Sequence, residues 1–361
     1  MTETSVAAPP TIPADWDDVT PDWMTAAIAG RHPGARVGAV TVLERDDGTN
    51  RRARLGLDYA AGSGPEVVFA KAENAVHREV HARNGNLFNE ALLYASGVPL
   101  PLDHPLPYAA TVDRDAFDYV IVMEDVTRRG ADPRDATRPL TVDQVAHGVR
   151  GLARLHSRYW GASAATHPAL DWTQAFEPTE GWQVGLRARI PTGFERLGDA
   201  LPDALATHDT EVVVGEWTRW LTAVGRLPRT LLHGDAHIGN TYVLPGDEVG
   251  FLDWQVTRWG HWSIDVGYFI QGSLTEEDRR RAEADLVEEY RSALGAGDGR
   301  PGRDEAWLAY RAAAAHGYAL WMSTLGSDGY QRPEVSHALA ARFAAAFAEL
   351  EAADAIDRLA A

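Results

Sequence analysis

The first part of the chain alternates apolar and polar positions in short runs that are interrupted by turn residues. A period of two is typical of strands with one buried face. We predict strands over residues 37–45, 52–60, 65–72 and 118–126. Apolar residues at helical spacing predict a short helix over 20–30 and a main helix over 87–97, which ends at Gly97 as helices often do. The first three strands form a meander with a polar turn over 46–51.

Near residue 127 the apolar spacing changes to the period of a helix. We expect helices over 140–161, 211–225 and 275–295 and in two Ala-rich C-terminal segments, with two strand-like pieces at 229–235 and 249–255. The expected fold class is therefore α+β and bilobal. Residues 1–11 would form a loose tail, 12–126 a small antiparallel β lobe, and 127–361 a larger, mostly helical lobe.

The composition excludes several classes of protein. The 361 residues carry a formal charge of −18, which argues against a nucleic-acid backbone or an anionic membrane as the main partner. There is no cysteine, so disulfides, thiolate metal sites and a cysteine nucleophile are excluded. No apolar run has the length of a membrane span, and the first residues do not resemble a signal peptide. We expect a cytoplasmic protein, and no feature indicates an oligomeric state.

The stretch 231–269 carries the most informative polar residues. Asn240 follows Asp235 by five residues, and Asp253 ends an apolar run thirteen residues after Asn240. Phosphoryl transfer from ATP needs a carboxylate near the attacking hydroxyl, oxygen ligands for Mg²⁺ and a cation on the phosphates. A hairpin over the intervening residues would return Asp253 beside Asn240, and Mg²⁺ prefers such hard oxygen ligands. The spacing therefore predicts a phosphotransfer site.

A zinc site is the alternative interpretation of this stretch. His233 and His237 have a spacing that on a helix can bind zinc together with a carboxylate. Gly234, Gly239 and the preceding strand indicate a loop, however, and the Asp/Asn/Asp set explains more residues. We therefore favour phosphotransfer.

The motif HGDAHIGN followed by DWQ resembles the catalytic loop and metal-binding motif of the aminoglycoside-phosphotransferase-like kinases. That family includes choline kinase, fructosamine kinase and the ecdysteroid-kinase-like proteins. The resemblance implies a protein-kinase-like fold, ATP (or GTP) and Mg²⁺ as cofactors, and a small-molecule alcohol as acceptor. It implies Asp235 as catalytic base and Asn240 and Asp253 as Mg²⁺ ligands. His233 and Asp265 would support the loop.

The first lobe offers the residues that a nucleotide site needs. Lys71 lies near the end of the third predicted strand and resembles the family's lysine on the α- and β-phosphates. Glu90, at the centre of the main helix, is its expected partner, with Glu73 and Glu79 as rivals. The resemblance places three more residues at the phosphates, namely Gly48, Thr49 and Asn50, although an ordinary hairpin turn also explains them. It places the adenine base along the inter-lobe connection, at Met123, Glu124 and Val126.

The acceptor stays open at this stage. Trp254, Trp259 and Trp262 could surround a ring-bearing acceptor or belong to the core. A nucleotide-binding pseudokinase is the alternative to an active enzyme, although the retained polar set favours turnover. Only eleven residues separate Asp253 from Asp265, which is too few for both a regulatory loop and a peptide platform. We therefore expect a small-molecule acceptor.

Overall fold

A computed structural model of the protein describes residues 11–76, 78 and 85–361. Most of the predicted tail 1–11 and the rival residue Glu79 lie outside the described residues. A five-stranded antiparallel sheet forms the N-terminal lobe in the order β1-β2-β3-β5-β4. Its strands are β1 (Arg36–Asp47), β2 (Arg51–Ala61), β3 (Val67–Ala72), β4 (Pro107–Asp113) and β5 (Asp118–Glu124).

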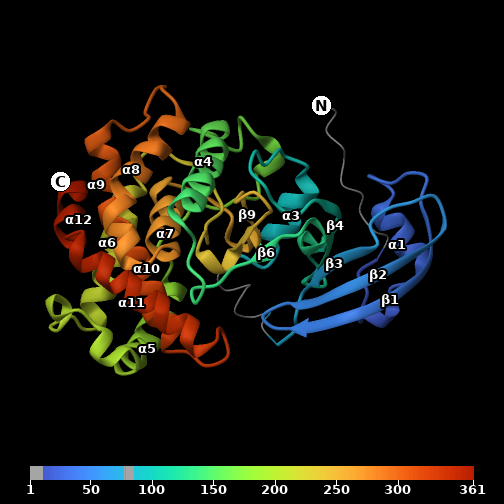
Figure 1. The fold of residues 1–361 in the computed structure, drawn as a ribbon, viewed down its shortest axis with the longest axis horizontal. Helices are drawn as coiled ribbons and strands as arrows, with labels where there is room; N and C mark the ends of the chain where they lie inside the picture. The colour runs from blue at the N-terminus through green and yellow to red at the C-terminus, as the bar shows by residue number, and fades with distance from the viewer. Residues whose placement is uncertain (1–10, 77, 79–84) are drawn as a thin grey trace.

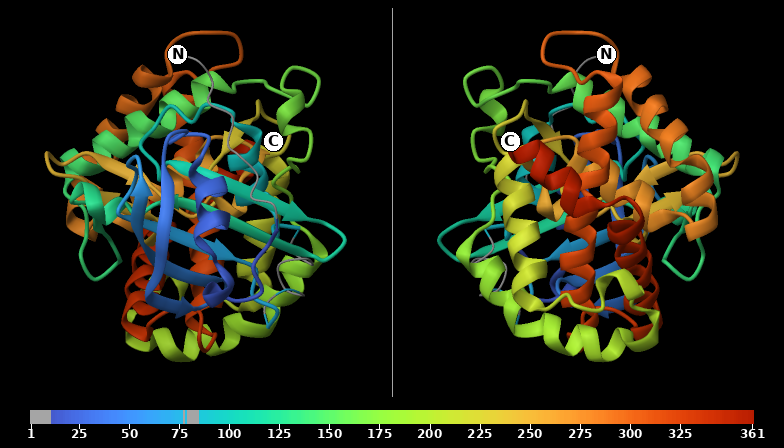
Figure 2. Two further views of the ribbon diagram at one scale, coloured as in Figure 1. Left: turned by 90° about the vertical axis from the view of Figure 1, so that its right-hand side faces the viewer. Right: turned by 90° about the vertical axis from the view of Figure 1, so that its left-hand side faces the viewer.

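Two helices cover opposite faces of this sheet. The helix α1 (Pro21–Ile28) begins at Thr20, whose side chain accepts a hydrogen bond from the Trp23 N–H, and it packs on the outer face (Figure 2). The helix α3 (Asn89–Ser96) ends at Gly97 in the left-handed conformation, as predicted. Its buried side chains belong to the same apolar cluster as the second lobe. The face of the sheet that carries α3 is therefore continuous with the C-terminal core.

The second lobe is mostly helical, and Figure 1 shows its helices on the side away from the sheet. Its helices are α4 (Val142–Arg158), α5 (Glu180–Leu197), α6 (Thr210–Val224), α7 (Ser263–Ser273), α8 (Glu276–Leu294), α9 (Arg303–Ala312), α10 (Ala314–Leu325), α11 (Pro333–Glu349) and α12 (Ala352–Ala360). The short strands are β6 (Asp132–Pro133), β7 (Thr230–Leu232), β8 (Thr241–Val243), β9 (Val249–Phe251) and β10 (Arg258–Gly260). Every residue of α7 is buried, so this helix lies at the centre of the lobe.

The bilobal α+β prediction is confirmed, with corrections to individual elements. The strand β4 was not predicted because its first residue is a proline after a Pro-rich stretch. The helix α5 was not predicted in the insert after α4, since Pro191 interrupts its helical pattern. The two Ala-rich C-terminal segments each divide into two helices. Within the described ranges, no helix is both long and apolar enough to span a bilayer.

Candidate active site

The predicted catalytic loop, His233–Asn240, joins β7 to β8 and contains a 3-10 turn over Ile238–Asn240. The strand β7 pairs antiparallel with β10, which anchors the start of the loop. Gly234 has a φ of +85°, and a Cβ there would lie 2.0 Å from the Val256 carbonyl oxygen. Only glycine fits this position, so the loop can pass directly over the segment that follows Asp253.

The Asp265 carboxylate holds the start of the loop through hydrogen bonds to its backbone. Its carboxylate lies in the first turn of α7 with 0% exposure, and it accepts hydrogen bonds from the His233 N–H at 2.7 Å and the Gly234 N–H at 2.8 Å. His156 of α4 contacts the same carboxylate through Nε2 at 3.1 Å. The Tyr290 hydroxyl lies 2.9 Å from the other ring nitrogen of His156. A buried network of Asp265, His156 and Tyr290 thus positions the backbone that carries Asp235.

His233 uses both ring nitrogens inside the loop. Nε2 lies 3.0 Å from the Leu252 carbonyl oxygen, and Nδ1 accepts from the Asp235 N–H at 3.2 Å. Burial lowers the pKa of His233, so the ring is neutral near pH 7. With both nitrogens engaged, His233 has no lone pair directed at a zinc ion. Among the described residues, no group of three or more His, Asp or Glu side chains could hold a metal, so the zinc alternative gains no support.

Asp235 and Asn240 meet as their spacing predicts. The Asn240 amide donates to the Asp235 carboxylate at 3.0 Å and to its carbonyl oxygen at 2.9 Å. The Asp235 side chain keeps 30% exposure. Burial, and then the neighbouring Asp253 charge, raise the pKa of Asp235 well above its ordinary value. A carboxylate with a raised pKa is a stronger proton acceptor.

Asp253 returns beside Asn240 through the β8–β9 hairpin, in which Thr241 pairs with Phe251. The Leu252 N–H donates to the Asn240 carbonyl oxygen at 2.9 Å. Asp253 has a φ of +62°, a left-handed conformation that aspartate tolerates better than most residues. Its carboxylate oxygen lies 2.9 Å from the Lys71 ammonium. Burial alone would raise the pKa of Asp253, but Lys71 outweighs it and lowers the pKa.

Lys71 and Glu90 form the predicted pair across the first lobe. Lys71 Nζ lies 2.6 Å from the Glu90 carboxylate, and both side chains are almost fully buried. Glu90 also accepts from the Trp254 N–H at 3.2 Å, which joins α3 to the residue that follows Asp253. The rival Glu73 is instead bonded to Arg78 at 2.8 Å. Lys71 therefore bridges a residue of each lobe.

A cavity of about 170 Å³ opens between the lobes at this point. Of the residues named from the sequence, it is lined by Lys71, Glu90, Met123, Glu124, Val126 and Asp253. Arg52 and Arg54 also line it and were missed; both lie on β2, one face of which points into the cleft. Arg54 is held by Asp125 at 2.9 Å. The sequence did contain a signal for these two residues. Arg52 and Arg54 are two positions apart just after the turn over 46–51, so on a strand their side chains point to the same face.

Gly48, Thr49 and Asn50 do not line the described part of this cavity. The Asn50 side chain is 2% exposed and donates to Gln255 at 3.2 Å, while it accepts from the Tyr119 hydroxyl at 2.6 Å. Thr49 accepts a long hydrogen bond from Asn50, and the Gly48 carbonyl accepts from Asn74. The turn is thus joined through Asn50 to the residue two places after Asp253.

Two supporting residues, His156 and Tyr290, were also missed in the sequence. His156 continues the apolar stripe of α4 with helical spacing after Leu152, so a buried polar partner could have been expected. Tyr290 lies on α8, far along the chain, and no local pattern identifies it. The three tryptophans Trp254, Trp259 and Trp262 are 0%, 7% and 0% exposed, so each belongs to the core.

The oxygen donors of Asn240 and Asp253 are of the hard kind that Mg²⁺ prefers. Asn240 uses its amide nitrogen on Asp235, so its amide oxygen is the atom available to a cation. Asp253 adds a carboxylate whose present partner is the Lys71 ammonium. Hard oxygen donors that are few in number suit Mg²⁺, which keeps water and phosphate oxygens in its shell.

Comparison with known proteins gives one family. A family model described as the phosphotransferase enzyme family matches residues 71–313. Among solved structures, the chain is similar to a choline kinase from Streptococcus pneumoniae, with 14% identity over 91% of this chain and 98% of that chain and a TM-score of 0.48. It is similar to a spectinomycin phosphotransferase in complex with ADP and spectinomycin, with 14% identity, 90% and 94% coverage and a TM-score of 0.48. No curated protein matches the chain.

Proposed function

We propose that this chain, which belongs to the phosphotransferase enzyme family, is a kinase that moves the γ-phosphoryl group of ATP onto a hydroxyl of a small molecule. The observation that carries the proposal is the convergence of Lys71, from the first lobe, on Asp253, from the second, at 2.9 Å. Asp253 is adjacent in the hairpin to the Asp235–Asn240 pair. The residues proposed as cation, metal ligand and base therefore come from neighbouring segments, which supports phosphoryl transfer.

The first lobe, residues 12–126, would hold the nucleotide. Lys71 would contact the α- and β-phosphates and Glu90 would orient it. The adenine base would lie along the chain from Met123 to Val126, where the inter-lobe cavity is apolar on the Met123 side. The turn Gly48, Thr49 and Asn50 would cover the phosphates. This last assignment requires the turn to approach the cavity when nucleotide binds, because Asn50 is bonded to Gln255.

Asn240 and Asp253 would hold Mg²⁺ through their side-chain oxygens. When bound, the ion supplies charge neutralisation at the β- and γ-phosphates. The chain prepares the site by holding Asp253 beside Asn240 in a short hairpin. Lys71 keeps the Asp253 carboxylate ionised before the nucleotide arrives, as the lowered pKa of Asp253 indicates.

Asp235 would accept the proton of the attacking hydroxyl. The acceptor oxygen forms a bond to the γ-phosphorus, the bond from that phosphorus to the bridging oxygen of ADP breaks, and the proton passes to the Asp235 carboxylate. His233 and Asp265 hold the loop that carries this carboxylate. ADP then carries away the negative charge of the leaving oxygen.

The acceptor would be a small molecule held by the second lobe, residues 127–361. Between Asp253 and Asp265 the chain forms only the 3-10 turn Trp254–Val256, the strand β10 and a tight turn. Each of these pieces is packed, and Trp254 and Trp262 are buried. No long, phosphorylatable segment intervenes, so the enzyme would be active without prior phosphorylation.

The test is to incubate unmodified protein with ATP, Mg²⁺ and a panel of hydroxylated small molecules or, separately, a generic peptide mixture. We expect ADP release and a product heavier by one phosphoryl group, detected by mass spectrometry, with at least one small molecule. Peptide phosphorylation, or activity that appears only after loop phosphorylation, contradicts the proposal. Nucleotide binding without turnover on any acceptor would instead indicate a pseudokinase.

A further inference from the structure

A second cavity, of about 420 Å³, lies in the helical lobe outside the inter-lobe cleft. It is enclosed by the end of α4, the α6–β7 connection, the β10–α7 turn, the α8–α9 connection, α9 and α12. Its volume is in the range of pockets that bind small molecules. None of the residues proposed above to bind nucleotide, metal or acceptor proton lines it.

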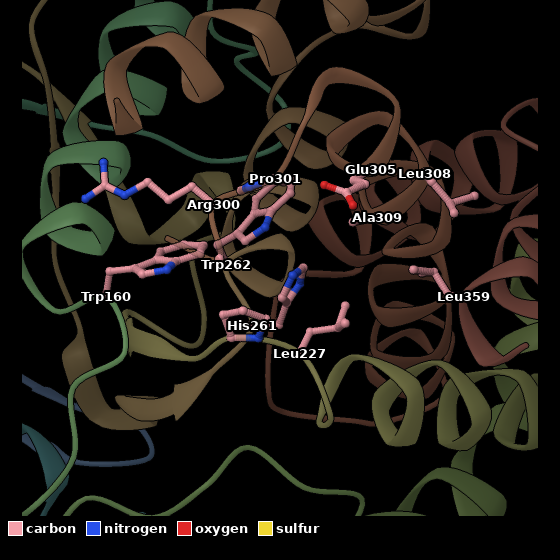
Figure 3. A pocket seen from close by; sticks show the side chains of 12 residues that line it. Trp160, Leu227, His261, Trp262, Arg300, Pro301, Glu305, Leu308, Ala309 and Leu359 are labelled. Atoms are coloured by element: carbon pink, nitrogen blue, oxygen red, sulfur yellow. The ribbon is translucent and has the colours of Figure 1, made fainter. Parts of the chain in front are cut away.

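The walls of this cavity are flat and apolar. Figure 3 shows Trp160 on one side, Leu308 and Leu359 on the other, and Trp262 with His261 between them. Tryptophan faces and aliphatic side chains favour a flat ring over a polyol, because burying a ring removes apolar surface from water without stranding hydroxyl groups. The cavity therefore selects for a ring.

One N–H donor is available at the centre. Trp262 is 0% exposed, so its indole N–H lies behind the cavity wall. His261 is 5% exposed, and its Nδ1 accepts from the Ser263 N–H at 3.4 Å and lies 2.8 Å from the Ser263 hydroxyl, which leaves the proton on Nε2. Burial lowers the pKa of His261 to about 3, so the ring is neutral. Within the described residues the Nε2–H of His261 donates no hydrogen bond, and a ligand with an acceptor atom would satisfy it.

Two charged side chains, Arg300 and Glu305, line the cavity, and they differ in whether they are free to bind a ligand. Arg300 is engaged with the Leu294 carbonyl oxygen and donates to the Ser157 hydroxyl at 2.9 Å. Glu305 lies on the opposite side in Figure 3, and among the described residues only the Gly302 N–H bonds to its carboxylate, at 2.8 Å through one oxygen. No ion pair involves Glu305 within the part of the chain that the structure describes. The free carboxylate oxygen favours a cationic group on the ligand.

The floor of the cavity is joined to the catalytic loop by direct contacts. Trp262 stacks on Tyr290, with ring centroids 4.7 Å apart and an interplanar angle of 22°. The Tyr290 hydroxyl contacts His156, and His156 contacts Asp265. Asp265 in turn accepts the two N–H groups that open the catalytic loop. The His261 ring lies 5.3 Å from the Trp262 ring, so a ligand that contacts His261 is linked through Trp262 to the loop.

We propose that this cavity is an effector site for a flat heteroaromatic molecule that carries a hydrogen-bond acceptor in the ring and a cationic side group, and that its occupancy is transmitted to the catalytic loop through Tyr290. The ring lies against Trp160, the acceptor faces the His261 Nε2–H, and the cation faces Glu305. The site is separate from the phosphotransfer site, and its tests do not require phosphoryl transfer.

Calorimetry with three ring-matched probes tests the binding: quinoline-3-methanamine, 3-methylquinoline and quinoline-3-carboxylate. We expect the amine to bind about tenfold tighter than the carboxylate, with the neutral probe between them. Glu305→Gln should remove the preference for the amine, whereas Glu277→Gln, an exposed glutamate on α8, should leave it unchanged. Leu227→Trp should fill the cavity and abolish binding of all three probes.

Hydrogen exchange tests the transmission. Saturating quinoline-3-methanamine should slow amide exchange in the peptide 231–240 about threefold or more in the unmodified protein. Tyr290→Phe keeps the ring that stacks on Trp262 but removes the hydroxyl on His156, so binding should persist while the exchange effect disappears. Absence of binding, competition of the amine with ATP, equal affinity for the three probes, or binding without altered exchange would each overturn the proposal. A normal thermal unfolding transition for every variant guards against misfolding.

Discussion

Asp253 and Asp265 are two aspartates of one short stretch, and the protein uses them in opposite ways. Asp265 is fully buried and accepts two backbone N–H groups and a histidine. Asp253 keeps 34% side-chain exposure, faces the cleft and has the Lys71 ammonium as its ion-pair partner. The first carboxylate is fixed to the protein, and the second can exchange a side-chain cation for a ligand.

This difference shows how one residue type is assigned to structure or to chemistry. A buried carboxylate that is saturated by donors gains stability from its charge and offers nothing to a substrate. A partly exposed carboxylate whose ion-pair partner is one lysine can accept a metal at modest cost. We therefore expect substitutions of Asp265 to alter stability and substitutions of Asp253 to alter ligand binding.

The largest effect is expected for Asp253→Ala. Loss of the cleft carboxylate should abolish Mg²⁺-dependent nucleotide binding and lower kcat/KM by roughly 10³-fold or more. The free energy of unfolding should change little, because the side chain is partly exposed. Titration calorimetry with ATP, with and without Mg²⁺, measures the binding. Stoichiometric zinc in the purified protein, or activity that is lost with zinc-specific chelators, would contradict the magnesium assignment.

Asp235→Asn should lower kcat by about 10²–10⁴-fold, which is the usual contribution of general-base catalysis. Nucleotide affinity should stay nearly unchanged, because the amide keeps the size of the side chain and the metal ligands remain. Steady-state kinetics on the identified acceptor measure the effect. Asp115→Asn, an exposed aspartate in the β4–β5 turn, is the matched control and should retain full activity. Near-normal turnover of the Asp235 variant would exclude it as the base.

Asp265→Asn should lower the stability of the protein, in contrast to the substitutions of Asp253. The amide replaces one accepting oxygen with a donor that faces a backbone N–H, so we expect the free energy of unfolding to fall by about 1–3 kcal/mol. Asp253→Asn, with the same chemical change in the cleft, should have a much smaller effect on stability. Urea unfolding of both variants measures the difference. Equal destabilisation would remove the distinction between the two aspartates.

The smallest effect concerns the pH dependence of stability that the buried His316 contributes. Burial lowers the pKa of His316 to about 3, although Asp265 partly offsets this, and the ring accepts from the Trp217 indole N–H at 3.2 Å. A folded-state pKa below the unfolded value of about 6.5 means that the stability is present above that pH and is lost as the pH falls toward 3. We expect a contribution of about 2 kcal/mol to be lost at pH 5.

His316→Gln removes this titration and keeps an acceptor for Trp217. Urea unfolding at pH 8 and pH 5 should therefore show a smaller loss of stability for the variant than for the unmodified protein. An equal loss in both proteins would show that His316 does not carry this pH dependence.

The sequence by itself determined the two lobes and the local geometry of the loop. Asp235 and Asn240 lie in one short loop, and the hairpin that follows it returns Asp253 to Asn240. All of these residues are close together in the chain. Local spacing also placed Lys71 on a strand and Glu90 on the next helix, and the structure pairs them at 2.6 Å. These features were predictable because short-range backbone geometry fixes which side chains share a face.

Only the tertiary structure decided the partners that lie far apart in the chain. Packing of α4 and α8 against α7 brings His156 and Tyr290 to Asp265. Because the two lobes approach each other, the Asn50 amide donates a hydrogen bond to Gln255, 205 residues away, and is not left free to bind phosphate. The effector cavity likewise arises where six segments meet. Such contacts depend on how apolar faces fill space together, and no periodicity along the sequence encodes which distant side chains will meet.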